Sequence, residues 1–382
     1  MKKFLDCISV VGTTPSRFQG TKKYVSTGAV ATTEIDESEV VEVTYEDRPS
    51  RANLSAEAGD ILFAKMQGTR KTLLLDSETE EHIYSTGFYA VRANPEVITT
   101  ECLYYLVDSE LFLTQKDKHC SGATQKAITN GGLAKIEIRI PALSEQGVLT
   151  DKLRYLTQLI SDKKKQLELF DEVIKSRFIE MFGEPESNPL HWKMLPLENC
   201  LTVLGGYAFK SEEFKTSGVP VLRIGNINTG VFTPTNMVYW SKDASLERYQ
   251  VLPGDLVISL TGTVGKDDYG NVCILGNAYT MYYLNQRNAK LILGESLNKH
   301  YLSELLKFSQ IKKKLTGISR GVRQANISNR DILNLVVPIP PIELQTQFSA
   351  FVEQTDKSKF EIQKSIEKLE TLKKALMQKY FG

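Results

Sequence analysis

The second half of this sequence repeats the first half at a spacing of 199 residues. The repeat holds without a gap for 62 residues, and ten identities stay in register across a loop, a strand and a long helical segment. A duplicated chain predicts two similar units related by an approximate two-fold axis, which suits a target in two parts such as DNA. Ten of the identical pairs are Gly122 and Gly321, Gln125 and Gln324, Ile128 and Ile327, Ile140 and Ile339, Pro141 and Pro340, Gln146 and Gln345, Glu168 and Glu367, Lys175 and Lys374, Phe182 and Phe381, and Gly183 and Gly382.

Length and composition are those of an ordinary soluble protein. The 382 residues are enough for two or three domains, and the net charge is only +1. If the chain binds DNA, the phosphate contacts must therefore come from local patches or from a partner subunit. The five cysteines have no C-x-x-C spacing, which predicts reduced thiols in a cytoplasmic protein. No apolar run approaches the length of a membrane span.

Each half ends in a long segment with helical periodicity. Residues 144–182 contain no proline, and at ~1.5 Å per residue this helix would run roughly 58 Å. A matching segment extends from residue 343 to the C-terminus, and apolar residues three and four apart form a seam on each. We expect the two helices to pair with each other within the chain as a coiled coil, the alternative being that each packs only on its own domain. The seam residues are Leu153, Leu156, Ile160, Leu167, Phe170 and Ile174 in the first helix, and Val352, Ile362, Ile366, Leu369 and Leu376 in the second.

Short strand-like runs separated by turn signals precede each helix. Residues 136–140 alternate apolar and polar side chains, and residues 59–63 have a counterpart at 254–258. One helical segment is expected in each half, at residues 103–111 and at residues 302–308. The pattern predicts a mixed α/β fold of two similar globular domains joined by two long helices. The predicted divisions are a first domain at 1–142, a central helix at 143–183, a second domain at 184–341 and a terminal helix at 342–382.

The sequence contains no recognisable catalytic or metal-binding motif. None of the four histidines has metal-ligand spacing, and the segment 262–267 is too short between its glycines to be a phosphate loop. No Gly-rich nucleotide fingerprint opens a helix after a strand. The sequence therefore predicts no catalytic residue, no bound metal and no cofactor in this chain.

Polar, glycine-containing loops recur at equivalent places in the two halves. One loop at residues 65–71 corresponds to residues 261–266, and a second at 121–126 corresponds to 320–324. Small residues let backbone N–H groups approach a phosphate, and Arg or Lys adds positive charge. Gln and Arg also form bidentate contacts with adenine and guanine edges in the major groove.

The repeated Gln125 and Gln324 favour a shared role, as a cap or a backbone contact, because sequence-specific contacts belong at positions that differ between halves. A third candidate is the aromatic segment at 206–211 with the polar residues that follow it. The predicted DNA-binding residues are Lys65, Gln67, Thr69, Arg70, Lys71, Thr124, Gln125, Lys126, Lys210, Ser211, Arg223, Asn226, Thr261, Thr263, Lys266, Arg320, Arg323 and Gln324.

These elements together resemble the specificity subunit of type I restriction-modification systems, over essentially the full length. The match rests on Trp192-x-x-x-Pro196-Leu197, Gly205-Gly206-Tyr207-x-Phe209-Lys210-Ser211, residues 218–227, and Gln324-x-x-Ile327-Ser328 leading to Pro338-Ile339-Pro340-Pro341 and a long helix. The first half departs at its start, which lacks the Gly-Gly-aromatic-Lys element, and conforms at its end.

The resemblance implies two target recognition domains held by two antiparallel helices, each domain reading one half of a split DNA sequence. It implies two methyltransferase subunits along the helices and nuclease-translocase subunits joining them. S-adenosyl methionine, ATP and Mg would belong to those partners. The helix length suggests half-sites about one turn of DNA apart, ~34 Å. The long helices carry apolar surface outside the seam, which would allow the chain to self-associate when its partners are absent.

Three other functions are alternatives to a type I specificity subunit. A single-chain DNA-modifying enzyme would need catalytic motifs that the sequence lacks. A coiled-coil scaffold without a DNA role would not need polar loops repeated at equivalent positions. A specificity subunit of a related modification or defence system with another effector is hardly separated by the sequence from the main hypothesis.

Overall fold

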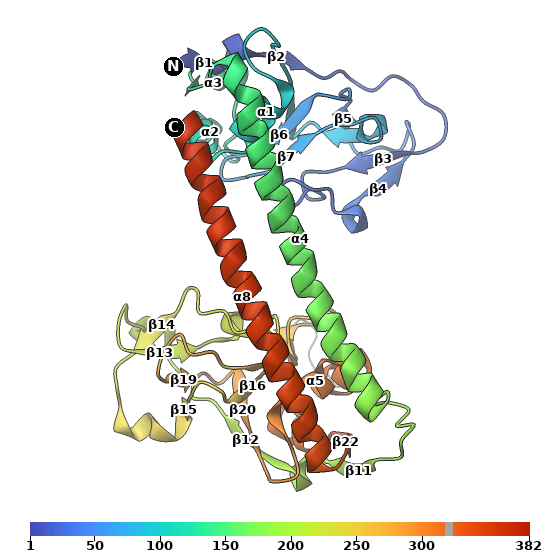
Figure 1. The fold of residues 1–382 in the computed structure, drawn as a ribbon, viewed down its shortest axis with the longest axis vertical. Coiled ribbons are helices and arrows are strands. Elements are labelled where there is room, and N and C mark those ends of the chain that lie inside the picture. Colours follow the sequence, from blue (N-terminus) through green and yellow to red (C-terminus); the bar gives the residue numbers. More distant parts are fainter. Residues whose placement is uncertain (318–323) are drawn as a thin grey trace. The chain divides into compact units, whose positions relative to one another are not determined.

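The computed structural model describes residues 1–317 and 324–382. The chain divides into two compact units: unit 1 comprises Met1–Lys165 and Gln363–Gly382, and unit 2 comprises Gln166–Ile362. Both long helices, α4 (Leu143–Phe182) and α8 (Ile342–Phe381), pass through this division. Each unit therefore contains a globular part and one end of each helix (Figure 1). The predicted divisions set the helices apart from the domains, whereas the helix ends belong to the units because they are buried in their cores.

Unit 1 is built around a four-stranded antiparallel sheet in the order β2-β9-β6-β7. All four residues of the inner strand β6 are buried. Because side chains alternate between the faces of a sheet, Ile61 and Phe63 enter one hydrophobic cluster while Leu62 and Ala64 enter another. The strands are β2 (Ile8–Val11), β9 (Phe88–Ala93), β6 (Ile61–Ala64) and β7 (Thr72–Leu74).

A second sheet in unit 1 has the order β4-β3-β8-β5, with β3 and β8 parallel. The segment expected to form one helix at 103–111 is instead two helices, because the Ser109 hydroxyl accepts a hydrogen bond from Phe112 N at 3.2 Å and starts a new helix. The remaining elements are β1 (Lys2–Lys3), β3 (Lys22–Val25), β4 (Val41–Val43), β5 (Ala52–Leu54), β8 (Ile83–Ser85), α1 (Thr100–Val107), α2 (Glu110–Lys118), α3 (Asn130–Leu133) and β10 (Glu137–Ile138), which pairs with β1.

Unit 2 repeats the topology of the two four-stranded sheets. Its sheets have the orders β12-β20-β16-β18 and β14-β13-β19-β15, again with one parallel pair, β13 and β19. The elements are β11 (Lys193–Pro196), β12 (Leu201–Gly205), β13 (Val219–Leu222), β14 (Val238–Trp240), β15 (Gln250–Val251), β16 (Leu256–Ser259), β17 (Thr261–Thr263), β18 (Val272–Ile274), β19 (Tyr282–Leu284), β20 (Asn288–Leu293), α5 (Lys299–Lys307), α6 (Ser309–Thr316), β21 (Gln324–Asn326), α7 (Asn329–Leu333) and β22 (Val336–Ile339), which pairs with β11.

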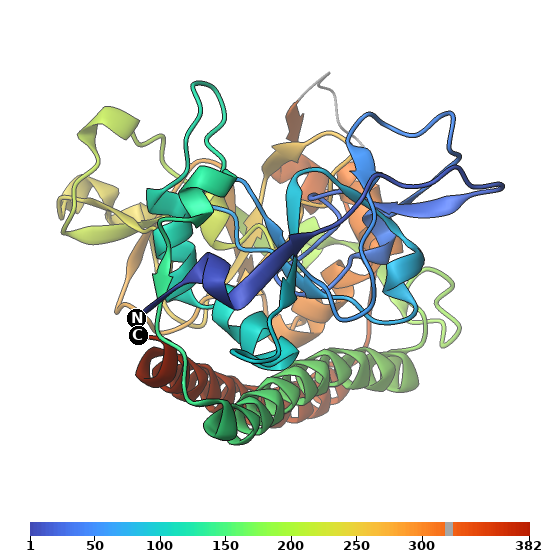
Figure 2. The ribbon, with the colours of Figure 1, turned by 90° about the horizontal axis from the view of Figure 1, so that it is seen from above.

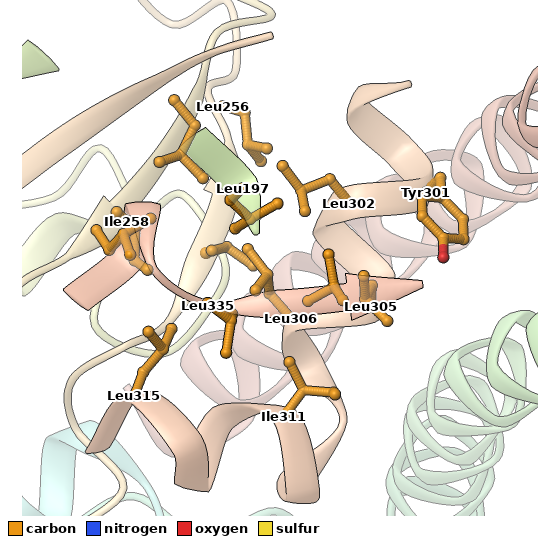
Figure 3. Close-up of a cluster of buried hydrophobic side chains, with 14 of the residues drawn as sticks. Leu197, Leu256, Ile258, Tyr301, Leu302, Leu305, Leu306, Ile311, Leu315 and Leu335 are labelled. Carbon is orange, nitrogen blue, oxygen red and sulfur yellow. The ribbon is translucent and has the colours of Figure 1, made fainter. Parts of the chain in front are cut away.

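The main hydrophobic core of unit 2 lies between its inner strand and its short helices. Leu256 and Ile258 of β16 face Leu302 and Leu305 of α5, while Val257 between them belongs to a separate cluster (Figure 3). This is the same alternation as in β6 of unit 1. The duplication seen in the sequence therefore extends to the order of the strands and to the alternation of side chains along the inner strands β6 and β16.

The repeated glutamine fixes the start of each long helix. Gln146 is fully buried; its Oε1 accepts from Thr99 N at 2.8 Å, and its Nε2 donates to the carbonyl oxygens of Val97 at 3.0 Å and Pro141 at 3.2 Å. Thr99 is the N-cap residue of α1. The amide thus joins the first turn of α4 to the start of α1.

Gln345 makes the same contacts in unit 2. It accepts from Asn298 N at 2.9 Å and donates to the carbonyl oxygens of Ser296 at 3.0 Å and Pro340 at 2.8 Å. Each partner lies 199 positions after its counterpart in unit 1. The identity of the two glutamines therefore has a structural cause.

The end of α8 completes the core of unit 1. Met377 and Phe381 are buried in the same cluster as Leu149 and Leu153 of α4 and Phe112 of α2. Figure 2 shows the two ends of the chain close together on this unit. Since the beginning of α4 lies with the end of α8, the two helices are antiparallel here.

The end of α4 completes the core of unit 2 in the same way. The Phe178 and Phe182 rings each lie 5.5 Å from the Phe348 ring of α8, and Ile174 and Val352 are buried in the same cluster. The predicted fold class is confirmed. The alternative that each helix packs only on its own domain is wrong, because α4 and α8 end in the cores of units built mainly from the other half of the sequence.

The seam residues fall into two groups by burial. Ion pairs flank the seam: within unit 1, Lys164 pairs with Glu370 at 3.2 Å, and within unit 2, Lys359 pairs with Asp171 at 2.5 Å. The buried seam residues are Leu153, Leu156, Ile160, Ile174, Val352 and Ile366, and the partly buried ones are Leu167, Phe170, Ile362, Leu369 and Leu376.

No helix among the described residues is long and apolar enough to cross a lipid bilayer.

Phe381→Ala should destabilise unit 1 by about 3–5 kcal/mol, because it removes a buried ring from the core of that unit. Apart from the end of α8, that core consists of residues from the first half of the sequence. Amide hydrogen exchange resolved along the chain should show faster exchange in β6 and α1 and little change in β16. The matched variant Phe182→Ala should reverse this pattern. Equal effects on both units from either variant would contradict the assignment of helix ends to cores.

Candidate nucleic-acid interface

Two of the predicted loops lie side by side in unit 1. Gln67 N donates to the Lys126 carbonyl oxygen at 2.9 Å, and Ile128 N donates to the Lys65 carbonyl oxygen at 2.9 Å. Met66 and Ala127 form an antiparallel bridge between these bonds. The loops at 65–71 and 121–126 are therefore joined into one surface, which their separation in the sequence did not reveal.

The corresponding loops pair in unit 2. Strand β17 pairs with β21, Thr261 opposite Asn326, and Ile327 N donates to the Leu260 carbonyl oxygen at 2.8 Å. Thr261 and Asn326 lie 195 and 199 positions after Met66 and Ala127, the same offsets as the flanking frame. The loop pair is thus a repeated feature of the fold.

The loop at 121–126 projects polar side chains into solvent. All of its residues are exposed, and the Thr124, Gln125 and Lys126 side chains make no hydrogen bond to the part of the chain that the structure describes. Gly122 has φ +140°, and a Cβ there would lie 2.3 Å from the Gln125 carbonyl oxygen, so the tight turn requires glycine. The turn leaves three unengaged polar side chains available to a ligand.

The neighbouring loop at 65–71 is held from below by a buried lysine. Lys116 of α2 has no exposed surface, and its Nζ donates to the carbonyl oxygens of Ala64 at 3.3 Å, Met66 at 3.1 Å and Thr69 at 2.8 Å. Burial lowers the pKa of Lys116, although Asp117 at 3.4 Å opposes that shift. The ammonium group fixes the path of the loop backbone.

Other polar groups tie the same loop to α2. Asp117 accepts from Gly68 N at 3.0 Å through Oδ2 and from the Gln67 amide at 3.1 Å through its carbonyl oxygen. Gln67 and Gly68 are exposed, while Thr69 is partly buried. The loop is therefore preorganised in the free protein, with Gln67 at its outer surface.

Three predicted cations in this loop are engaged within unit 1. Arg70 donates to the buried Asp108 carboxylate through Nε at 3.0 Å and Nη2 at 2.9 Å, and that bond raises the pKa of Arg70. Lys71 Nζ donates to the Thr27 carbonyl oxygen. Lys65 Nζ donates to the Thr86 carbonyl oxygen at 2.9 Å and lies over the Tyr89 ring. These contacts give the three cations a role in shaping the loop that the sequence did not indicate.

The unit 2 loop is shaped by different residues. Thr263 is exposed and both its N and Oγ1 donate to Asp268, at 2.8 and 3.0 Å, and Lys266 is exposed. Thr261 is buried, with its hydroxyl lacking a hydrogen-bond partner in the described structure. The Thr261 side chain therefore faces inward in this structure, and its contact with DNA stays a prediction.

Asn226, another predicted DNA-binding residue, also has a buried side chain. It is 3% exposed and its amide donates to the carbonyl oxygens of Thr233 and Thr235, both at 3.0 Å. Arg223 beside it is partly exposed. Asn226 therefore fixes the turn that presents Arg223.

The remaining predicted residues are placed as follows. Lys210 is exposed and pairs with Glu213 at 3.4 Å, and Ser211 is exposed and donates to Glu212 at 3.2 Å. Arg320 and Arg323 lie outside the described residues, and Gln324 is described only by its place in β21.

Sequence reasoning missed the buried lysines beneath the loops. In unit 2, Lys312 of α6 is 8% exposed and binds Asp267 and the Asn271 side chain. For Lys116 a signal existed: it follows Phe112 by four residues, which places a lysine on the apolar face of its helix. A charged residue at such a position requires internal partners.

No three His, Cys, Asp or Glu side chains among the described residues are grouped closely enough to hold a metal ion. The five cysteines are free thiols in the structure. The site consists of repeated polar loops on a rigid frame, which is an arrangement for binding.

Comparison with known proteins identifies the family. The sequence model of the type I restriction modification DNA specificity domain matches residues 12–169 and 189–374. This chain belongs to that family. Each of the two matched segments covers the globular part and much of the long helix of one half. The predicted family is confirmed.

The curated relatives are specificity subunits of type I restriction enzymes. The chain is 28% identical to the MjaVIII specificity subunit of Methanocaldococcus jannaschii over 261 residues, which are 63% of this chain and 60% of that protein. It is 23% identical to the EcoKI specificity subunit of Escherichia coli over 351 residues, 84% of this chain and 74% of that protein. The first of these matches thus spans about 60% of the relative's length.

Solved structures share the fold. A type I restriction-modification S subunit from M. genitalium superposes with a TM-score of 0.55 at 13% identity, covering all of this chain and 95% of that one. A chain from a type I restriction-modification assembly gives 0.53 at 20% identity, covering 98% and 97%. At these identities the similarity establishes the architecture alone.

Lys116→Met should loosen the loop at 65–71, because three carbonyl oxygens lose their shared donor in a dry environment; we expect a loss of about 2 kcal/mol or more in unfolding free energy. Amide exchange at residues 66–70 should rise by more than the global change. The exposed Lys118 of the same helix provides a control as Lys118→Met, which should leave both measurements unchanged. Unchanged exchange in Lys116→Met would show that the loop does not depend on Lys116.

Proposed function

We propose that this chain is the DNA-recognition subunit of a type I restriction-modification complex and that each unit reads one half of a bipartite DNA target. The observation that carries the proposal is the paired polar loops, built with the same backbone hydrogen bonds in both units but with different side chains. A repeated frame with divergent exposed residues suits two half-sites of different sequence.

The exposed loop at 121–126 supports a reading role in unit 1. Its Thr124, Gln125 and Lys126 side chains are exposed and unengaged, and the loop beneath is held rigid by Lys116 and Asp117. A rigid support reduces the entropy lost when side chains bind base edges. Thr124, which differs from its counterpart Arg323, is suited to base edges in the major groove, whereas Gln125, repeated as Gln324, is suited to a contact that both half-sites share.

The catalytic steps are assigned to partner subunits. The family consists of specificity domains, and the sequence contains no methyltransferase or nuclease motif. We propose that methyltransferase subunits carry S-adenosyl methionine and that nuclease-translocase subunits use ATP and Mg. This chain would set where those partners act.

Apolar side chains on the long helices offer a surface to such partners. On α4, Val148 is 59% and Tyr155 is 66% exposed in unit 1, and Leu169 is 57% exposed in unit 2. Residues seven apart lie on one face of a helix, so Val148 and Tyr155 form a stripe beside the buried seam. Exposed apolar stripes of this kind support binding of a methyltransferase helix and, without partners, self-association.

Exchange of residues 1–141 for the corresponding segment of a relative should change one half of the methylated motif and preserve the other half. The reason is that loops at 65–71 and 121–126 both belong to unit 1. The measurement is methylation sequencing of cells that express the chain with its methyltransferase subunit. Cells without the chain are the control, and a change in both halves of the motif would contradict one reader per half-site.

Tyr155→Glu should weaken co-purification of the methyltransferase subunit at least tenfold, because it places a carboxylate in a buried apolar contact. The melting temperature of the isolated chain should change little, since Tyr155 is exposed. The control is Lys165→Gln, which changes the net charge of α4 by the same amount at an exposed position. This variant should bind the methyltransferase subunit normally. Normal assembly by Tyr155→Glu would rule out this face as the contact.

A further inference from the structure

A polar pocket in unit 2 lies next to the loops around β17 and β21, which are called the reading loops of this unit below. The cavity is about 510 Å³ and is lined by Arg223, Arg287, Gln286, Asn236 and two aromatic rings, Phe209 and Phe214. Arg223 directly follows β13, and the lining residues Gln286 and Arg287 follow β19 within three residues, in the second sheet of the unit. Two guanidinium groups in one cavity indicate an anionic ligand.

The pocket is connected to the reading loops through backbone hydrogen bonds. Leu260 N donates to the Arg287 carbonyl oxygen at 2.8 Å, and Ile327 N donates to the Leu260 carbonyl oxygen at 2.8 Å. Leu260 directly precedes β17, and Ile327 directly follows β21. A ligand that binds Arg287 therefore lies one strand away from the surface that would face bases.

The guanidinium groups have unused donors. Arg287 and Gln286 are exposed, and their side chains make no hydrogen bond or ion pair to the described residues. Arg223 donates from Nη2 to the Asn236 carbonyl oxygen at 2.7 Å, but its Nε is buried and unpaired within the described structure. An unpaired buried donor is costly, so a small movement of Arg223 toward an acceptor in the pocket would be favourable.

The shape of the site distinguishes between the parts of DNA. Base edges lie inside the grooves and are reached by protruding loops, and a stacked base enters a protein pocket only when it is flipped out. Phosphates project from the duplex and fit a concave site. A concave, doubly basic pocket beside a protruding loop pair thus matches a phosphate next to the bases that the loops read.

We propose that Arg223 and Arg287 bind a backbone phosphate of the half-site and thereby set the register of the unit 2 loops on the duplex. This inference rests on the proposed DNA-recognition function and adds the division of roles within unit 2: the pocket positions, and the loops specify. The counterpart of Arg287 in unit 1 is Gly87, which accepts the equivalent hydrogen bond from Lys65 N at 2.8 Å. The phosphate clamp is therefore a property of unit 2.

The test is the salt dependence of DNA binding by the complex of this chain with its methyltransferase subunit. The probes are a duplex carrying the methylated motif and duplexes with single base-pair changes. Arg287→Gln should lower the slope of log K against log salt by about one, as expected for one lost phosphate contact. Affinity for the motif and for the changed duplexes should fall by the same factor, about tenfold, leaving their ratio intact. Arg223→Gln should act in the same direction.

Two further variants make the test decisive. Arg287→Lys keeps the charge and should restore most of the slope and affinity, which separates a phosphate contact from bidentate recognition of guanine. Arg248→Gln removes an exposed charge of unit 2 outside the pocket and should behave as the unchanged protein.

The inference is overturned if Arg287→Gln binds with unchanged slope, or if discrimination at one base pair falls while the slope stays the same. In either case the unchanged complex still selects its motif, and the proposed function stands. If the unchanged complex shows no preference for any motif, the proposed function itself fails.

Discussion

The buried amides of Gln146 and Gln345 determine how each long helix leaves its globular part. Each side-chain amide makes hydrogen bonds to three backbone groups. It accepts from the N–H of the N-cap residue of a short helix, and it donates to one carbonyl oxygen just before that helix and to one just before the long helix. A residue without this amide would leave those groups unpaired in a dry core, at a cost of about 1–3 kcal/mol each. The direction of α4 in unit 1 and of α8 in unit 2 thus depends on one side chain in each unit.

The other end of each long helix is buried in a core built mainly from the other half of the sequence. Phe182 ends α4 in the core of unit 2, and Phe381 ends α8 in the core of unit 1. Each half of the sequence therefore supplies part of the hydrophobic core of the other. The repeated Phe-Gly pair at the two helix ends is explained by this exchange: the ring fills a core, and Gly183 adopts φ +76°, as helix-terminating glycines do.

The sequence predicted the frame well and the site only in part. Duplication, the two helices and the seam could be predicted because they depend on periodicity and on identical residues at a fixed offset. The pairing of the loops depends on contacts between residues about 60 positions apart, and no local pattern encodes it. Thr261 and Asn226 were polar residues in a plausible loop, yet both side chains turn inward, since polarity alone does not give direction. Lys116 was overlooked for the converse reason, because lysines are rarely buried without partners and those partners are carbonyl groups.

Backbone bonding and side-chain identity are separate in this fold. The hydrogen bond from Lys65 N to the Gly87 carbonyl oxygen in unit 1 is equivalent to that from Leu260 N to the Arg287 carbonyl oxygen in unit 2. Both are 2.8 Å long, although the residues at both positions differ between the units. Lys116 beneath one loop occupies the place of Leu315 in the other unit, where Lys312 instead supports the loop. Because the main chain supplies the loop pairing, the surrounding side chains can change without loss of the frame. The two surfaces can therefore diverge toward different half-sites while their supporting strands and helices remain alike.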